Sequence, residues 1–156
     1  MSFQHVDLNS QNLIESAKSD CDNIRNACGH LVNGLTEFFD QTHVKLKYGA
    51  TFAIKGDLGA TVTTLFGEAR GRLTIQLVGE AMEGRYVFEK SVVSDEGQDI
   101  WLPIWAIRIG RYANVWLGDE GDIQIDVINR GPHNQSISAM AKSLLYRIAA
   151  TPIFKQ

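Results

Sequence analysis

Residues 72–93 read RLTIQLVGEAMEGRYVFEKSVV, and they contain the pattern that predicts an antiparallel sheet. Its first part alternates apolar and polar side chains, so that Leu73, Ile75 and Leu77 share one face. Such alternation is typical of a strand with one face in the core. A glycine-containing break then leads to a second run of strand-forming residues, 85–93. The break is too short for a parallel crossover, so the two strands are expected to be antiparallel.

Similar runs lie on both sides of this pair, separated by turn residues such as those at Gly67 to Gly71. In the earliest run Val44, Leu46 and Tyr48 alternate with polar residues, and Gly49 is expected to mark a bend or bulge. The expected strands are 44–55, 60–66, 72–78, 85–93, 100–109, 112–117 and 123–128. The sequence therefore predicts an antiparallel meander of six or seven strands within about residues 44–128.

A long helix is expected before the sheet, over about residues 9–42. Its apolar side chains are spaced alternately three and four residues apart, which is the heptad pattern. They are Ile14, Ala17, Cys21, Ile24, Cys28, Leu31, Leu35 and Phe38. The stripe widens in its second half, as expected for packing on a sheet, whereas its narrow first half resembles a helix–helix seam. Because of this narrow half we predict a homodimer whose interface contains Ile14, Ala17, Cys21, Ile24 and Cys28.

A second helix is expected near the C-terminus, over about residues 135–150, where apolar residues recur at helical spacing before Pro152. The chain of 156 residues suits a single domain spanning 1–156. The expected fold class is therefore α+β, with an antiparallel meander packed by a long N-terminal helix and a C-terminal helix.

The composition bears on location and partners. The net charge is −3 with both signs scattered, whereas a general nucleic-acid binder needs a concentrated basic field. Three lysines on one expected strand face, Lys45, Lys47 and Lys55, form only a small basic patch, so nucleic acid is not the expected partner. No apolar stretch is long enough to span a bilayer, and the first residues do not resemble a signal peptide. A cytoplasmic protein without a membrane partner is therefore expected.

Motifs for catalysis or metal binding are absent from the sequence. It contains no G-x-S-x-G, P-loop or H-E-x-x-H pattern. Its histidines are scattered, and its acidic glycine turns, 95–97 and 119–121, lack the spacing of a calcium loop. We expect neither a metal nor a cofactor, and whether the chain has enzymatic activity is left open.

The least ordinary segment is the run 101–116, which contains every tryptophan of the chain. In the expected strand Trp101, Pro103 and Trp105 share one face, and Pro103 favours a sheet edge or a bulge. Trp, Tyr and Arg together are enriched at protein–protein hot spots, whereas Trp is also commonly buried as core. The candidate partner-binding or ligand-binding residues are Trp101, Trp105, Arg108, Arg111, Tyr112 and Trp116.

Two functions remain open at this point. The first is a non-catalytic protein-interaction module, such as a chaperone, inhibitor or immunity-type binder, which binds a protein partner or a second copy and acts as an oligomer. Its support is the heptad helix and the Trp/Arg segment. The alternative is a small-ligand-binding protein or an enzyme, with a cavity between the sheet and the helices.

Overall fold

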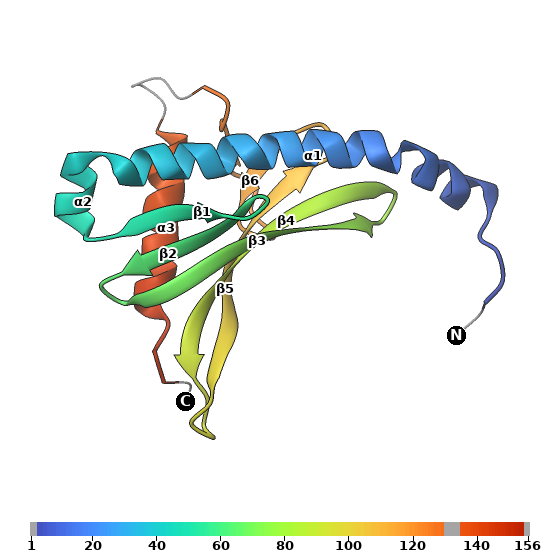
Figure 1. Cartoon of the computed structure of the whole chain (residues 1–156). Helices are drawn as coiled ribbons and strands as arrows, with labels where there is room; N and C mark the ends of the chain where they lie inside the picture. The colour runs from blue at the N-terminus through green and yellow to red at the C-terminus, as the bar shows by residue number, and fades with distance from the viewer. Residues whose placement is uncertain (1–2, 130–134, 155–156) are drawn as a thin grey trace.

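A computed structural model describes residues 3–129 and 135–154 of the chain. In these residues three helices accompany a seven-stranded sheet (Figure 1). The helices are α1 (Leu8–Asp40), α2 (Thr42–Tyr48) and α3 (Ser136–Ala150). The strands are β1 (Thr51–Lys55), β2 (Gly59–Thr64), β3 (Gly67–Val78), β4 (Ala81–Val93), β5 (Asp99–Gly110), β6 (Val115–Leu117) and β7 (Gln124–Ile125). None of the described helices is long and apolar enough to cross a membrane.

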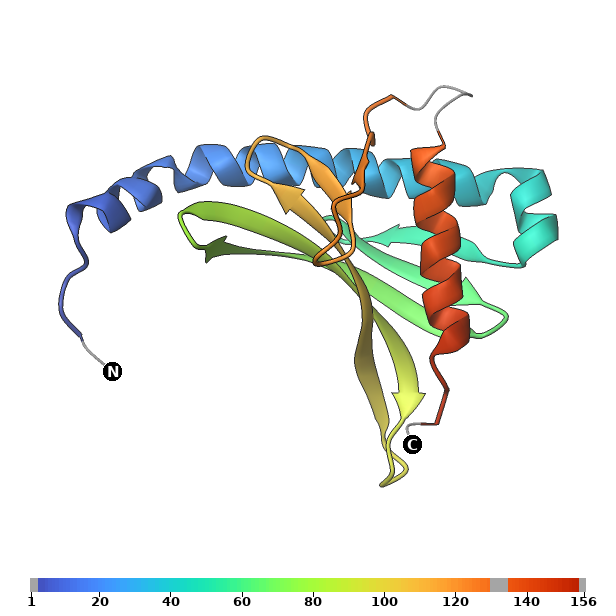
Figure 2. The ribbon, with the colours of Figure 1, turned by 180° about the vertical axis from the view of Figure 1, so that it is seen from behind.

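The sheet is a meander in which each strand pairs antiparallel with the next along the chain. It curves strongly around the helices, as the two opposite views show (Figures 1 and 2). The predicted α+β class and the antiparallel meander with its two flanking helices are thus confirmed. The curvature leaves one face of the sheet toward the helices, which we call the inner face, and the other toward solvent, the outer face.

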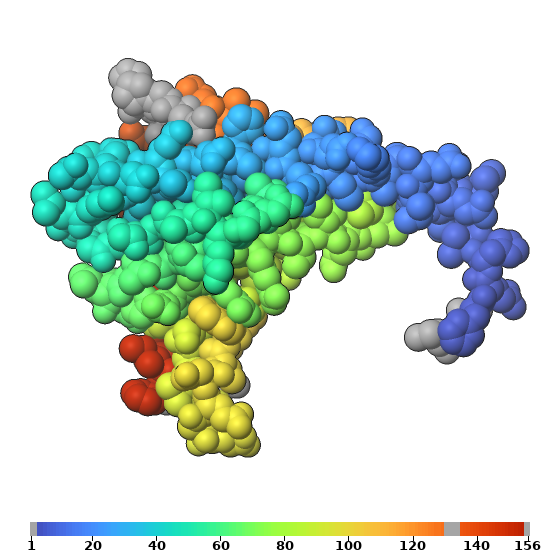
Figure 3. All heavy atoms as spheres, in the orientation of Figure 1, coloured from blue at the N-terminus to red at the C-terminus, as the bar shows by residue number. Residues whose placement is uncertain are grey.

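Helix α1 begins where Asp7 accepts a hydrogen bond from the Ser10 amide at 2.8 Å, which satisfies one of the free N–H groups of the first turn. The first turns extend beyond the sheet (Figures 1 and 3), and burial begins at Ile24 and continues to Phe39. The wide second half of the apolar stripe therefore packs on the inner face, as expected.

Two glycines on the inner face leave room for side chains that pack directly on the sheet. A Cβ atom at Gly84 of β4 would lie 2.5 Å from Cγ2 of Ile24, so α1 approaches the sheet more closely there than an alanine would permit. A Cβ atom at Gly71 of β3 would lie 2.4 Å from Cε1 of Tyr86, whose ring covers that position on the inner face. The hydroxyl of Tyr86 donates to the carbonyl of Leu58 at 2.8 Å, so this buried polar group is satisfied.

Helix α3 is joined to the sheet by a buried lysine. Lys90 of β4 is 1% exposed, and its ammonium donates to the carbonyl of Ile148 at 2.7 Å and to that of Thr151. These carbonyls belong to the C-terminal end of α3, where the helix dipole favours a positive charge. Burial lowers the pKa of Lys90 from its ordinary value.

The buried apolar residues form one cluster between the inner face and the helices. Its largest members come from both layers. They are Ile24, Leu31, Leu35, Phe39, Tyr86, Phe88, Ile107, Ile109, Met140, Leu144 and Ile148. Side chains of the sheet and helices therefore occupy the space between these layers.

The structure corrects the start of the expected sheet. Residues 44–48 lie in helix α2 rather than in a strand, and Gly49 ends this helix in the left-handed conformation with φ 62°. Val44 is buried while Leu46 is exposed. In a helix, residues two apart point to different sides, whereas residues four apart, such as Val44 and Tyr48, share a face. The expected turn from Gly67 to Gly71 is also wrong, since β3 already begins at Gly67.

Candidate functional site

Two tryptophans lie on the outer face of the sheet, each beneath an arginine. Arg108 of β5 pairs with Trp116 of β6, and its guanidinium lies 4.9 Å from the centroid of that ring. The same guanidinium donates to the carbonyls of Asp119 at 3.1 Å and Gly121 at 2.9 Å. Arg108 is therefore held in place by backbone oxygens while it covers the indole.

The second pair lies toward the tip of the β4–β5 hairpin. The guanidinium of Arg70 in β3 lies 4.3 Å from the ring centroid of Trp101 in β5, and Trp101 is 38% exposed. Between them lies Glu89 of β4, which is buried and lies opposite Arg70 across the strand pair. Its carboxylate accepts from Nε of Arg70 at 3.0 Å and lies 3.2 Å from Nε of Arg72. A buried carboxylate thus holds two guanidinium groups on the outer face.

A third arginine joins these groups. Arg85 of β4 lies opposite Arg108, and it binds both carboxylate oxygens of Asp119, at 2.8 and 2.5 Å. This ion pair, together with the bonds from Arg108, fixes the loop after β6 on the outer face. The hydrogen bond that Arg85 donates to Asp119 raises the pKa of this guanidinium above its ordinary value. We call the whole set the arginine–tryptophan face, and it comprises Arg70, Arg72, Arg85, Trp101, Arg108 and Trp116.

Trp105 does not belong to this face, contrary to the expectation that Trp101, Pro103 and Trp105 share one side. The pairing of β5 with β4 shifts at this point: Pro103 lies opposite Glu89, but Trp105 lies opposite Phe88. The extra residue between them is a β-bulge, which reverses the facing of everything that follows. Trp105 consequently stacks on Phe88 at 6.0 Å and packs against the core. The bulge adjacent to Pro103 agrees with the predicted effect of that proline.

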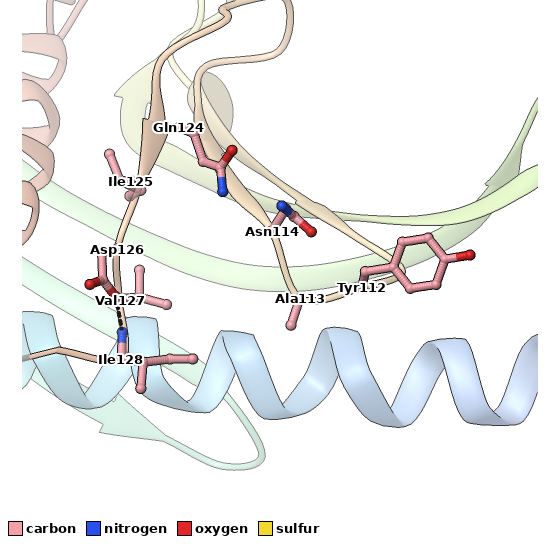
Figure 4. A pocket seen from close by; sticks show the side chains of 8 residues that line it. All are labelled: Tyr112, Ala113, Asn114, Gln124, Ile125, Asp126, Val127 and Ile128. Atoms are coloured by element: carbon pink, nitrogen blue, oxygen red, sulfur yellow. Dashed lines mark hydrogen bonds between the residues drawn. The ribbon is translucent and has the colours of Figure 1, made fainter.

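Arg111 and Tyr112 lie elsewhere, in the turn between β5 and β6. Their side chains stack on each other at 4.7 Å, and the carbonyl of Arg111 accepts from Nδ2 of Asn23 in α1. Figure 4 shows Tyr112 at the rim of an open hollow of about 410 Å³, with Asn114 and Gln124 facing each other across it. The six predicted site residues are thus distributed over three places rather than gathered in one.

The residues of the predicted dimer interface also divide. Ile24 and Cys28 are buried within a single chain, against the sheet, and are not available to a second copy. Burial raises the pKa of Cys28 to about 12, so its thiol is protonated and unreactive near neutral pH. Ile14 is 65% exposed, and Ala17 and Cys21 are partly exposed. Only the first part of the predicted seam therefore faces outward.

The sequence did not predict the ion pairs beside the tryptophans, which join Arg70 and Arg72 to Glu89 and Arg85 to Asp119. The turn between β3 and β4 could have predicted the pairing of Arg70 with Glu89. This turn consists only of Gly79 and Glu80, because Val78 pairs with Ala81, and a two-residue turn at this place fixes the register that puts Arg70 opposite Glu89. The link from Arg85 to Asp119 had no such signal, because it depends on the path of a loop.

The arginine–tryptophan face combines guanidinium and indole groups with the carboxylates that pair with the arginines. Guanidinium groups over indole rings offer flat, rigid surfaces with hydrogen-bond donors at their rims. Among the described residues, no group of three His, Cys, Asp or Glu side chains is placed to hold a metal ion. Of the three lysines considered for nucleic acid, Lys45 and Lys47 lie on α2 and Lys55 ends β1.

Comparisons with family models, with curated proteins and with solved structures find no match to this chain.

Proposed function

We propose that this chain is a non-catalytic protein-interaction module that binds a protein partner through the arginine–tryptophan face. The observation that carries the proposal is the pair of guanidinium-covered indoles, Trp101 and Trp116, on the sheet face that the helices leave uncovered. Trp and Arg are the residues whose loss most often weakens protein–protein binding. An indole has few rotatable bonds, so little conformational entropy is lost when a partner covers it.

The arginines of this face are already ordered before any partner arrives. Glu89 holds Arg70 and Arg72, Asp119 holds Arg85, and backbone carbonyls hold Arg108. Their remaining N–H groups point from fixed positions, which lowers the entropy cost of each new hydrogen bond. Preorganisation of this kind favours binding of one partner shape over many.

The charge of the outer face favours a protein over a nucleic acid. Glu68 and Glu83 lie on the same face as the four arginines, in addition to Glu89 and Asp119. The positive charges are therefore balanced by carboxylates. A phosphate backbone needs an excess of positive charge, whereas a protein surface of mixed charge can meet both signs.

The alternative of a small-ligand-binding protein or an enzyme requires a cavity between the sheet and the helices. Core side chains from both layers pack in that space, including Tyr86, Phe88 and Met140. The hollow in Figure 4 lies instead beside the β5–β6 turn and is open to solvent. These observations favour the interaction module.

We propose further that the module self-associates through the first turns of α1. The apolar side chain of Ile14 is exposed, and Ala17 and Cys21 continue its stripe toward the sheet. This part of the helix extends beyond the sheet, so a second helix can approach it without displacing core contacts (Figure 3). Two such stripes packed together would bury apolar area that a single chain leaves in water.

Capture of a partner by a tagged chain tests the main proposal. The wild-type chain is expected to co-purify with one protein, and Trp101→Ala is expected to lose it. Thr63→Ala, an exposed position on β2 of the same outer face, serves as the matched control and should retain the partner. Thermal stabilisation by one member of a metabolite panel, with no captured protein, would instead favour the small-ligand alternative.

A further inference from the structure

One half of β5 has a free edge. Of its residues 99–110, only Arg108 and Ile109 pair with β6, and Ile107 forms a single bridge to Gly118. On the side away from β4, residues 99–106 have no strand beside them in the described part of the chain. Figure 2 shows this half of the β4–β5 hairpin extending away from β6. A free edge presents backbone N–H and C=O groups that another extended chain can pair with.

A groove follows this edge. One hollow of about 400 Å³ is lined by residues 103–106 of β5, by Gly118 and Asp119, by Arg147 of α3, and by Arg85 and Val87 of β4. A second hollow of about 570 Å³ adjoins it, lies between α3 and the loop after β6, and shares Trp105, Asp119 and Arg147 with the first. Together they form a channel with an edge strand on one side and a helix on the other. We call it the β5–α3 groove.

The walls of this groove differ in chemistry. Ile123 and Tyr146 are exposed there and supply apolar area next to Trp105. Lys142 and Arg147 of α3 also line the groove, and both side chains are exposed. Neither has an ion-pair partner among the residues that the structure describes.

The carboxylates of the groove leave this positive charge largely uncompensated. Asp119 is already neutralised by Arg85, which leaves Glu120 against the two cations of α3. Asp99 lies at the far end of the free edge, near the hairpin tip. Negative charge on a bound segment is therefore favoured at the end near α3 and disfavoured at the tip.

We propose that the β5–α3 groove binds an extended acidic segment of a partner protein, with apolar side chains over Trp105 and Tyr146 and carboxylates toward Lys142 and Arg147. The inference adds a second site to the proposed interaction module and names the chemistry of the segment it takes. A protein is favoured over a nucleic acid because the free edge offers peptide hydrogen-bonding groups, which a phosphodiester backbone cannot pair with in register.

Pro103 and the bulge after it limit the backbone pairing. A proline has no N–H to donate, and a bulge interrupts the regular spacing of the edge. Such devices protect edge strands from indiscriminate pairing. The bound segment is therefore expected to pair over a short length, so side-chain contacts with α3 must contribute most of its specificity.

Selection of peptides on the intact chain tests the inference. A phage library of random peptides is selected on the wild-type protein, and the recovered peptides are labelled and titrated by fluorescence anisotropy. The groove variant is Lys142→Glu/Arg147→Glu. The matched control is Lys45→Glu/Lys47→Glu, which makes the same charge change at exposed positions of another helix. Circular dichroism melts establish that both variants fold.

Enrichment of Asp and Glu between apolar residues is expected, together with a loss of roughly tenfold or more in affinity for the groove variant and little change for the control. Recovery of no binder, of binders without acidic residues, or of binders equally weakened by both variants would overturn the inference. Preferential binding of a labelled single-stranded oligonucleotide at the groove would overturn it in favour of nucleic acid. These outcomes are read from variants of Lys142 and Arg147, whereas the test of the arginine–tryptophan face uses Trp101→Ala, which does not line the groove.

Discussion

Arg70 covers Trp101 across an intervening strand: its guanidinium lies 4.3 Å from the ring centroid, and Glu89 of the middle strand holds it there. The three residues come from β3, β5 and β4, in that order. The arrangement keeps a large indole partly exposed to solvent in one fixed orientation. A partly exposed tryptophan contributes less to the free energy of unfolding than one that fills a core. Substitution by alanine can therefore distinguish the two kinds of tryptophan.

Replacement of the tryptophans on opposite faces of β5 should lower stability by unequal amounts. Trp101→Ala removes a partly exposed ring, so the free energy of unfolding should fall by about 1 kcal/mol or less. Trp105→Ala removes a ring that stacks on Phe88, and the loss should be about 3 kcal/mol. Urea denaturation of the two variants measures both values. Equal and large losses would mean that Trp101 is a core residue, and the proposed face would then lose its most exposed member.

The β5 segment also shows how far sequence reasoning reaches. Alternation predicted the strand, because side-chain facing in a strand follows directly from its period of two. The missing N–H of Pro103 predicted an edge or a bulge. It could not predict on which residue the bulge falls, and that single residue moved Trp105 to the inner face. The facing of a strand beyond a bulge depends on its partner strand, which a local pattern does not contain.

Residues 44–48 illustrate a second limit. Val44 and Tyr48 are four apart, a spacing that fits one face of a helix and one face of a strand equally well. Gly49 ends α2 in the left-handed conformation. A glycine in this conformation is common at the end of a helix as well as at a bend, so the residue type alone did not distinguish the two. The long heptad pattern of α1 carried no such ambiguity, because it repeats over many turns. Short apolar runs are therefore the places where this sequence misleads.

The contact between α1 and β4 can be tested at its tightest point. Gly84→Ala would place a Cβ atom 2.5 Å from Cγ2 of Ile24, so the helix must shift. The free energy of unfolding should fall by about 1–3 kcal/mol, as for overpacking in other cores. Ile24→Ala removes Cγ2, so the double variant should lose less stability than the sum of the two single losses. Additive losses would show that the helix and Gly84 are not in contact.

Lys90 is expected to be essential for docking the end of α3. Lys90→Met keeps the apolar stem but leaves the carbonyls of Ile148 and Thr151 without their donor, at a cost of about 1–3 kcal/mol for each buried group. Hydrogen exchange should then show faster opening of the last turn of α3. Lys142→Met, on the exposed side of the same helix, is the control and should leave both measurements unchanged.

The difference in stability between the wild type and Lys90→Met should depend on pH in a defined direction. Burial lowers the pKa of Lys90, so the unfolded chain holds its proton more tightly than the folded chain does. The stability of the wild type relative to Lys90→Met should therefore rise with pH in the window below the ordinary lysine value of 10.5. A relative stability that falls over this window would contradict the assigned direction.

Self-association is expected to depend on Ile14 and not on Ile24. Ile14→Glu places a charge on the exposed stripe of α1, so a dimer should dissociate while the fold stays intact. Light scattering after size exclusion gives the mass, and far-UV circular dichroism gives the helix content. Glu15→Gln, at the adjacent position on the polar face, is the control. A wild-type chain that is monomeric at tens of micromolar would contradict the proposed self-association.

Binding of a protein to the arginine–tryptophan face should be visible in the dissociation constant of the captured partner. Isothermal titration would compare the wild type with Trp101→Ala, Trp116→Ala and the control Thr63→Ala. We expect each tryptophan variant to weaken binding by roughly tenfold or more, with the control unchanged and Trp101→Ala melting within a few degrees of the wild type. Undiminished affinity of both tryptophan variants would overturn the proposed binding face.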